Sequence, residues 1–179
     1  MSTILYSTFP RTEPPPEFVS SLVQAFIDHE SSISTLGREK GLTSDAVLSE
    51  LRVDLQAIGF EVERGKATAD KIKRPVFFGE NGVPGLQYEV DAFHPVWRCG
   101  LEIEAGRAWL GNAVYRDLIQ ALVMVNLDFL ALAVPNGYRR KSLGRNVVSK
   151  DYENTCAVAE SLYAHSRLRM PYGLVVIGY

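Results

Sequence analysis

Hydrophobic residues change their spacing several times along the chain, and each spacing predicts a type of element. Apolar residues three and four positions apart predict helices over residues 18–28, 46–58, 109–126 and 151–168. Alternating or continuous apolar residues predict strands over residues 60–63, 86–93, 98–105, 129–134 and 174–177. The connecting polar stretches, which carry turn-forming residues, are expected to be loops over residues 31–41, 64–84 and 135–150.

The order of these elements predicts an α/β fold with a mixed sheet and helices on both faces. Residues 86–93 and 98–105 are expected to pair as an antiparallel hairpin around a turn near Pro95. The later alternation of helix and strand is typical of crossover connections. The length of 179 residues suits one domain over 1–179, with residues 1–42 as an N-terminal helical extension.

Composition narrows the range of functions. With 46% hydrophobic and 22% charged residues, the chain has the composition of a folded globular protein. Its cysteines, Cys99 and Cys156, lie far apart and outside any zinc-binding spacing, which favours a reducing, cytoplasmic location. We expect no membrane span, because no apolar run approaches about 20 residues. We also expect no nucleotide cofactor, because no glycine-rich phosphate-binding loop occurs.

Three acids on neighbouring predicted strands are the strongest candidate for a functional site. Side chains alternate along a strand, so Glu102 and Glu104 point to one side, and Asp91 can lie opposite them. Carboxylates this close repel one another, and burial increases the cost of their charge. A divalent cation would neutralise them, and ligands that offer only oxygen select Mg²⁺, with Mn²⁺ as a substitute.

Magnesium bound in this way suggests phosphodiester hydrolysis. The ion keeps coordination sites for water and phosphate oxygens, lowers the pKa of the water, and stabilises charge that develops on the phosphate. A simpler interpretation is that the acids lie on a solvated face and bind nothing. Three fixed positions occur often by chance, so the pattern itself permits both interpretations.

The stretch from Asp91 onwards resembles the signature of the PD-(D/E)xK nuclease superfamily, and more narrowly the BglII/BamHI branch of type II restriction endonucleases. In that branch a strand aspartate is followed by a strand with E-x-E or E-x-Q, where most relatives have E-x-K. Here the second strand reads Leu101-Glu102-Ile103-Glu104-Ala105-Gly106-Arg107 and precedes a long predicted helix. The step from helix 46–58 to strand 60–63 also resembles the superfamily's opening, so the resemblance covers residues 43–134.

The resemblance implies a role for each matching residue. Asp91 and Glu102 would be metal ligands, and Glu104 would replace the usual lysine and help to hold or deprotonate the attacking water. Arg107 would supply positive charge near the scissile phosphate, although it would equally suit a helix cap or a backbone phosphate. Glu50, on the opening helix, would be a further metal ligand, although exposed acids are the norm on helices.

The charge distribution permits a nucleic-acid partner, although the net charge is only −2. Residues 1–63 hold four basic and ten acidic residues, a net of −6, whereas residues 64–179 hold fifteen and eleven, a net of +4. Basic residues concentrate in two predicted loops beside the acids, where they would bind phosphates or simply keep the surface solvated. The candidates are Lys71, Lys73, Arg74, Arg139, Arg140, Lys141 and Arg145.

These observations favour a Mg²⁺-dependent DNA endonuclease that acts as a homodimer, since duplex cleavage needs two sites and the chain offers one. One alternative is a catalytically silent relative that binds nucleic acid or protein, which the glutamate at position 104 favours. A further alternative is a small metal-dependent phosphohydrolase that acts on nucleotides.

Overall fold

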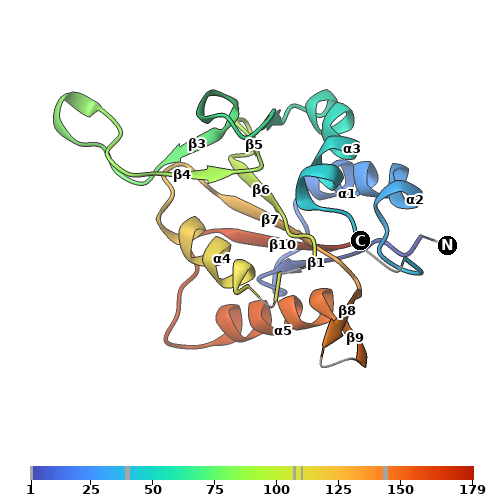
Figure 1. Cartoon of the computed structure of the whole chain (residues 1–179). Coiled ribbons are helices and arrows are strands. Elements are labelled where there is room, and N and C mark those ends of the chain that lie inside the picture. Colours follow the sequence, from blue (N-terminus) through green and yellow to red (C-terminus); the bar gives the residue numbers. More distant parts are fainter. Residues whose placement is uncertain (1, 39–40, 107, 110, 143–144) are drawn as a thin grey trace.

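A six-stranded mixed sheet forms the centre of the molecule (Figure 1). The computed structural model describes residues 2–38, 41–106, 108–109, 111–142 and 145–179. The strand order across the sheet is β1-β10-β7-β6-β5-β2. In chain order these strands are β1 (Leu5–Phe9), β2 (Glu61–Val62), β5 (Ala92–His94), β6 (Cys99–Ile103), β7 (Phe129–Val134) and β10 (Gly173–Gly178).

Strand directions confirm the predicted mixed sheet. The central strands β6, β7 and β10 run parallel to one another, while β1 and β5 pair antiparallel at either side of them. The predicted hairpin forms between β5 and β6, where Ala92 pairs with Leu101 and His94 with Cys99. The helices of the molecule cover both faces of this sheet.

One face of the sheet is covered by the helices that precede β2. These are α1 (Phe18–Asp28), α2 (Glu30–Ile33) and α3 (Ser44–Ala57). The side chain of Thr43 accepts a hydrogen bond from the backbone N–H of Ala46 and caps α3, while Gly59 ends it with a φ of +106°. A Cβ at Gly59 would lie 2.7 Å from Nε2 of His94, so only glycine fits this turn.

The opposite face is covered by α4 (Ala113–Val123) and α5 (Asp151–Ala164). Successive residues of β7 alternate between the two cores: Ala131 and Ala133 face α1 and α3, and Leu130 and Leu132 face α4 and α5. No helix in the described part of the chain is both long enough and apolar enough to cross a membrane.

The predicted strand over residues 86–93 is wrong as a single element, because the chain changes sheets at Asp91. Its first part, β4 (Gln87–Val90), pairs with β3 (Ile72–Pro75) in a separate ribbon, and its second part is β5. The Asp91 carboxylate accepts a hydrogen bond from the backbone N–H of Ile103, at the point where the chain joins the main sheet. The predicted loop 64–84 therefore contains a strand, and short 3-10 helices at Thr68–Asp70 and Glu80–Gly82.

The predicted loop over residues 135–150 is also wrong. It forms a two-stranded ribbon of β8 (Tyr138–Ser142) and β9 (Arg145–Ser149), in which Arg139 pairs with Val148. A solvated two-stranded ribbon buries little, so its polar composition resembles that of a loop.

The N-terminal region is more than the predicted helical extension. Its strand β1 forms an edge of the main sheet and pairs with β10 along its whole length. Leu5 and Tyr6 remain exposed on this edge, which is why the segment lacks the alternation of a half-buried strand.

Candidate active site

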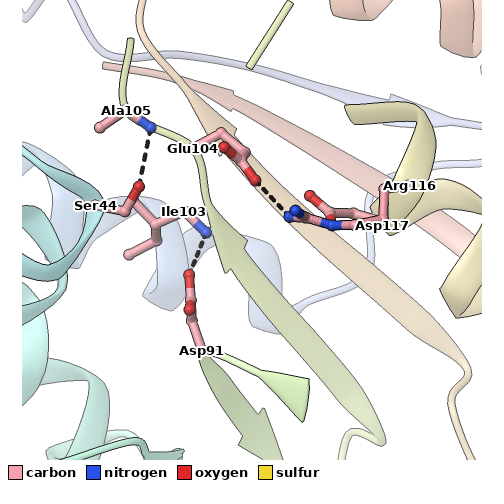
Figure 2. A network of polar contacts seen from close by, with 7 residues as sticks. All are labelled: Ser44, Asp91, Ile103, Glu104, Ala105, Arg116 and Asp117. Carbon is pink, nitrogen blue, oxygen red and sulfur yellow. Dashed lines mark hydrogen bonds and ion pairs between the residues drawn. The ribbon is translucent and has the colours of Figure 1, made fainter. Parts of the chain in front are cut away.

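The hairpin of β5 and β6 brings the acids Asp91 and Glu102 together, as the sequence predicted. The register that pairs Ala92 with Leu101 places Asp91 next to Glu102 at the end of the hairpin. A hydrogen bond of 2.8 Å from the Ile103 N–H holds the Asp91 carboxylate in place (Figure 2). Glu102 is buried on the sheet face that α4 covers, with 8% of its surface exposed.

Helix α4 adds another acid, Asp117, which sequence reasoning did not single out. Asp117 is 2% exposed and lies on the same helix face as Val114, Leu118 and Ala121, all of them buried. An acid within an otherwise apolar buried stripe is the signal that would have identified it, since such residues are rarely buried without a partner or a function. Its Oδ2 atom is buried, and no fixed donor among the described residues reaches it, although the Glu104 carboxyl group lies beside it.

Arg116 connects this helix to the strand that carries the predicted acids. Its Nε donates a hydrogen bond of 2.9 Å to Asp117, and its terminal NH2 group donates one of 3.0 Å to Glu104. Figure 2 shows Glu104 and Arg116 pointing toward each other, with Asp117 beside them. The acid at position 104 is therefore paired with a cation from α4.

These residues line a cleft with a volume of about 480 Å³. Five of its lining residues are acids and two, Lys71 and Arg116, are cations, whereas Glu104 and Glu50 do not line it. Such an excess of carboxylates in a confined space favours either protons or a metal cation. The lining residues are Glu63, Lys71, Gln87, Tyr88, Glu89, Val90, Asp91, Glu102, Arg116, Asp117 and Gln120.

Burial and mutual repulsion raise the pKa values of these acids. Burial, together with the charges of Glu63 and Asp117, raises the pKa of Asp91 to about 7. Burial, and then the neighbouring Asp117, raises the pKa of Glu104 to about 8. Burial and the charge of Asp91 raise the pKa of Glu102 well above its usual value, and burial raises that of Asp117. Such raised values occur at functional sites, although structural networks also produce them.

Lys71 lines the cleft and pairs with Glu63. Its Nζ lies 2.8 Å from a carboxylate oxygen of Glu63, and both side chains are largely buried. The hydrogen bond that Lys71 donates to Glu63 raises the pKa of Lys71, so this lysine is positively charged at neutral pH. The sequence predicted Lys71 as a nucleic-acid contact, and the structure places it at the acid cleft itself.

The other predicted basic contacts of this region differ in accessibility. Lys73 is exposed on β3. Arg74 stacks over the ring of Phe93 at 3.7 Å and points its guanidinium toward the Val125 carbonyl, and burial lowers its pKa. Arg74 therefore tethers β3 to the body of the protein and has little freedom to reach a ligand.

The second basic segment lies on the β8–β9 ribbon. Arg139 is exposed there, whereas the side chains of Arg140, Lys141 and Arg145 fall outside what the structure describes. The first residue of this ribbon, Tyr138, packs against the segment that follows β6. A Cβ at Gly106 would lie 2.3 Å from the ring of Tyr138. Arg107, for which the sequence predicted a catalytic role, lies outside the described residues.

Glu50, the predicted additional metal ligand, is exposed on α3 and does not line the cleft. The additional acid that does line the cleft is Asp117, on α4.

The donor set of the cleft suits magnesium. All the candidate ligands are carboxylate oxygens, which Mg²⁺ prefers, and Mg²⁺ commonly binds through only one or two carboxylates plus water. Within the described ranges, no group of three or more His, Cys, Asp or Glu side chains is already arranged to hold a metal ion. Asp91, Glu102 and the unpaired Oδ2 of Asp117 are the residues that fit the ion best.

Comparison with known protein families and with curated proteins finds no match to this chain.

Proposed function

We propose that the protein is a Mg²⁺-dependent endonuclease that hydrolyses phosphodiester bonds of DNA. The observation that carries the proposal is the convergence of Asp91, Glu102 and Asp117 on one cleft, with an unpaired carboxylate oxygen among them. The resemblance to the restriction-endonuclease branch of the PD-(D/E)xK superfamily supports the same chemistry for Asp91 and Glu102. The fold would then be restriction-endonuclease-like.

The residues of the cleft would have different roles in binding a phosphodiester. Asp91, Glu102 and Asp117 would hold Mg²⁺, which when bound polarises a water molecule and the phosphate. The cations Lys71 and Arg116 line the same cleft and would bind the non-bridging phosphate oxygens. The Ile103 N–H fixes the orientation of Asp91, and Arg116 holds Glu104. Water activation by Glu104 stays a prediction from the resemblance.

Duplex DNA is the substrate that this arrangement favours. Exposed Lys73 and Arg139 lie on the two ribbons, and both would contact phosphates of a long substrate. One chain offers one cleft of this kind among its described residues, so cutting both strands at one site would require a homodimer.

A second candidate function is a silent module that binds nucleic acid or protein. The observation in its favour is that Glu104 stands where a lysine is usual in the superfamily, and is neutralised by Arg116. Such a module would keep the fold and lack carboxylate-dependent metal binding.

Plasmid cleavage with Mg²⁺ or with EDTA separates the two candidates. The Asp91→Asn and Glu102→Gln variants are expected to lose turnover by on the order of a thousandfold, because a metal site supplies several kcal/mol of transition-state stabilisation. Glu153→Gln, an exposed acid on α5, is the matched control and should cleave like the wild type. Isothermal titration with Mn²⁺ should show binding that both cleft variants lose.

Undiminished cleavage in both cleft variants would refute the assignment. Absence of both cleavage and carboxylate-dependent Mn²⁺ binding in the wild type would favour the silent module.

A further inference from the structure

The ribbon of β3 and β4 forms an arm that extends from the cleft into solvent (Figure 1). Its base is fixed to the body, since the Pro75 carbonyl accepts a hydrogen bond from the Val125 N–H and Arg74 stacks on Phe93. Beyond this anchor, every residue from 77 to 87 is exposed. The arm is nevertheless ordered by backbone hydrogen bonds from Val76 to Leu86 and from Gly85 to Phe77.

The end of the arm is apolar. Its large exposed hydrophobic residues are Phe77, Phe78, Val83 and Leu86, with 40–61% of their surfaces exposed. Glu80 is the one charged residue between positions 76 and 88. Folding does not account for the exposed part of this surface, because these side chains leave 40–61% of their surface in solvent on an ordered projection. Such patches mark interaction sites.

The arm and the cleft are continuous. Residues Gln87 to Val90 of β4 line the cleft, and Asp91 follows directly. A polymer whose phosphate lies at Asp91 can therefore run alongside the arm. From Gln87 to Asp91 the extended chain of β4 covers about 13 Å, which matches the width of a DNA major groove of about 12 Å, and a two-stranded ribbon fits such a groove.

We propose that the β3–β4 arm is a DNA-binding element, whose apolar end lies in a groove of the duplex beside the bond to be cut, with Phe78 against a base step. This inference rests on the proposed nuclease function. Apolar side chains inserted at base steps are a general means of gripping and bending DNA. Phe77 supports the end of the arm, because its ring lies so close over Gly85 that a Cβ there would be 2.4 Å away.

The test compares a Phe77→Ser/Phe78→Ser variant with a control, Val53→Ser/Leu168→Ser, which removes exposed apolar residues elsewhere. Binding to a pool of random-sequence DNA duplexes is followed by fluorescence anisotropy in EDTA at several salt concentrations. Because stacking on an aromatic ring contributes at the scale of a tenfold change or more, the arm variant should bind about ten- to a hundredfold more weakly. The slope of log affinity against log salt should stay unchanged, whereas Lys73→Ala should reduce it by about one.

Two further measurements show whether weaker DNA binding by the arm variant reflects the arm alone or a failure of the proposed nuclease function. Hydrolysis of bis(p-nitrophenyl) phosphate with Mn²⁺ reports on the cleft alone, and the arm variant should match the wild type while Asp91→Asn does not. Light scattering after gel filtration reports the oligomeric state, which should also be unchanged.

Duplex affinity of the arm variant within about twofold of the control would overturn the inference and leave the nuclease proposal standing. Weaker binding that accompanies loss of a dimer would also overturn it, because the arm would then contact a second copy of the chain. A wild type that binds no duplex, yet hydrolyses the small diester through Asp91, would overturn the inference as well.

Discussion

The two faces of the central sheet are built differently, and the difference identifies the functional side. Toward α1 and α3, the buried strand residues are apolar apart from His94, which contacts the Ile58 carbonyl. The apolar residues are Ala92, Cys99, Leu101, Ile103, Ala131, Ala133, Val175 and Ile177. Toward α4 and α5, the face is apolar over β7 and β10, but acidic at the end of β6, where Glu102 meets Asp117. Glu102 and Asp117 are buried, so solvation of an exposed surface does not explain these two acids.

The apolar face contributes stability through burial, whereas the acidic end opposes it. Charging buried carboxylates beside one another costs free energy, which appears as raised pKa values of Asp91 and Glu104. The apolar part of the second face must offset this cost. A strained polar cluster within a well-packed sheet is the pattern expected of a site selected for binding.

The largest expected effects are on the free energy of unfolding, which should respond differently to substitutions on the two faces of the sheet. Leu101→Ala removes a fully buried side chain from the apolar face and should lower the free energy of unfolding by about 2–5 kcal/mol. Glu102→Gln, the adjacent residue on the other face, should leave it unchanged at pH 7 to within about 1 kcal/mol and raise it at higher pH, because it removes a costly charge. Urea denaturation in EDTA measures both. A loss at Glu102→Gln equal to that at Leu101→Ala would remove the contrast between the faces.

The acidic end should also make stability depend on pH in the absence of metal. The folded-state pKa values of Asp91 and Glu104, about 7 and about 8, lie above those of an unfolded chain. The native state therefore binds more protons between pH 4 and pH 8, so this part of the stability is present at low pH and is lost as the pH rises, by several kcal/mol. Mg²⁺ should restore stability at pH 8.

Calorimetry on the wild type and on Asp91→Asn/Glu104→Gln measures this effect as a difference, which cancels the contribution of other groups. The variant should have the flatter pH profile. Parallel profiles would show that the two carboxylates titrate alike in the folded and unfolded chains.

A smaller change is expected at Arg116, which compensates part of the acidic charge. Arg116→Gln should lower the free energy of unfolding by about 1–2 kcal/mol at pH 8, because Glu104 and Asp117 lose their cation. At pH 5, below its pKa of about 8, Glu104 is protonated, so the effect should be smaller. Thermal unfolding at both pH values, with Arg116→Lys as the conservative control, tests this; an equal loss at both values would assign Arg116 a packing role.

The sequence was informative wherever one face of an element is buried. The α1 and β7 bounds match the predicted ranges, and the β5–β6 hairpin that brings Asp91 to Glu102 follows from alternation alone. The sequence was uninformative for the two-stranded ribbons, which bury little apolar surface, so β3, β8 and β9 were predicted as loops. The break at Asp91 depends on a hydrogen bond to Ile103, a contact that local periodicity does not encode.

The sequence also did not predict which residues of other elements join the site, because this depends on tertiary packing. Asp117 lies 15 residues after Glu102 on a different element, and its place in the cleft depends on how α4 packs over β6. Lys71 was predicted as a loop contact, and its pairing with Glu63 depends on the path of the chain before β3. Helical stripes indicate which residues are buried, and only the packed structure shows which of them meet.

The smallest expected effect concerns the acid on the apolar side of the sheet. Glu50 lies exposed on α3, so Glu50→Gln should change the free energy of unfolding by less than about 0.5 kcal/mol. Its Mn²⁺ affinity should equal that of the wild type, whereas Asp117→Asn should weaken binding at least about tenfold. Isothermal titration of both variants distinguishes a ligand supplied by α4 from one supplied by α3. Weakened binding in Glu50→Gln alone would place the metal toward α3, and the acidic end of the second face would then need another explanation.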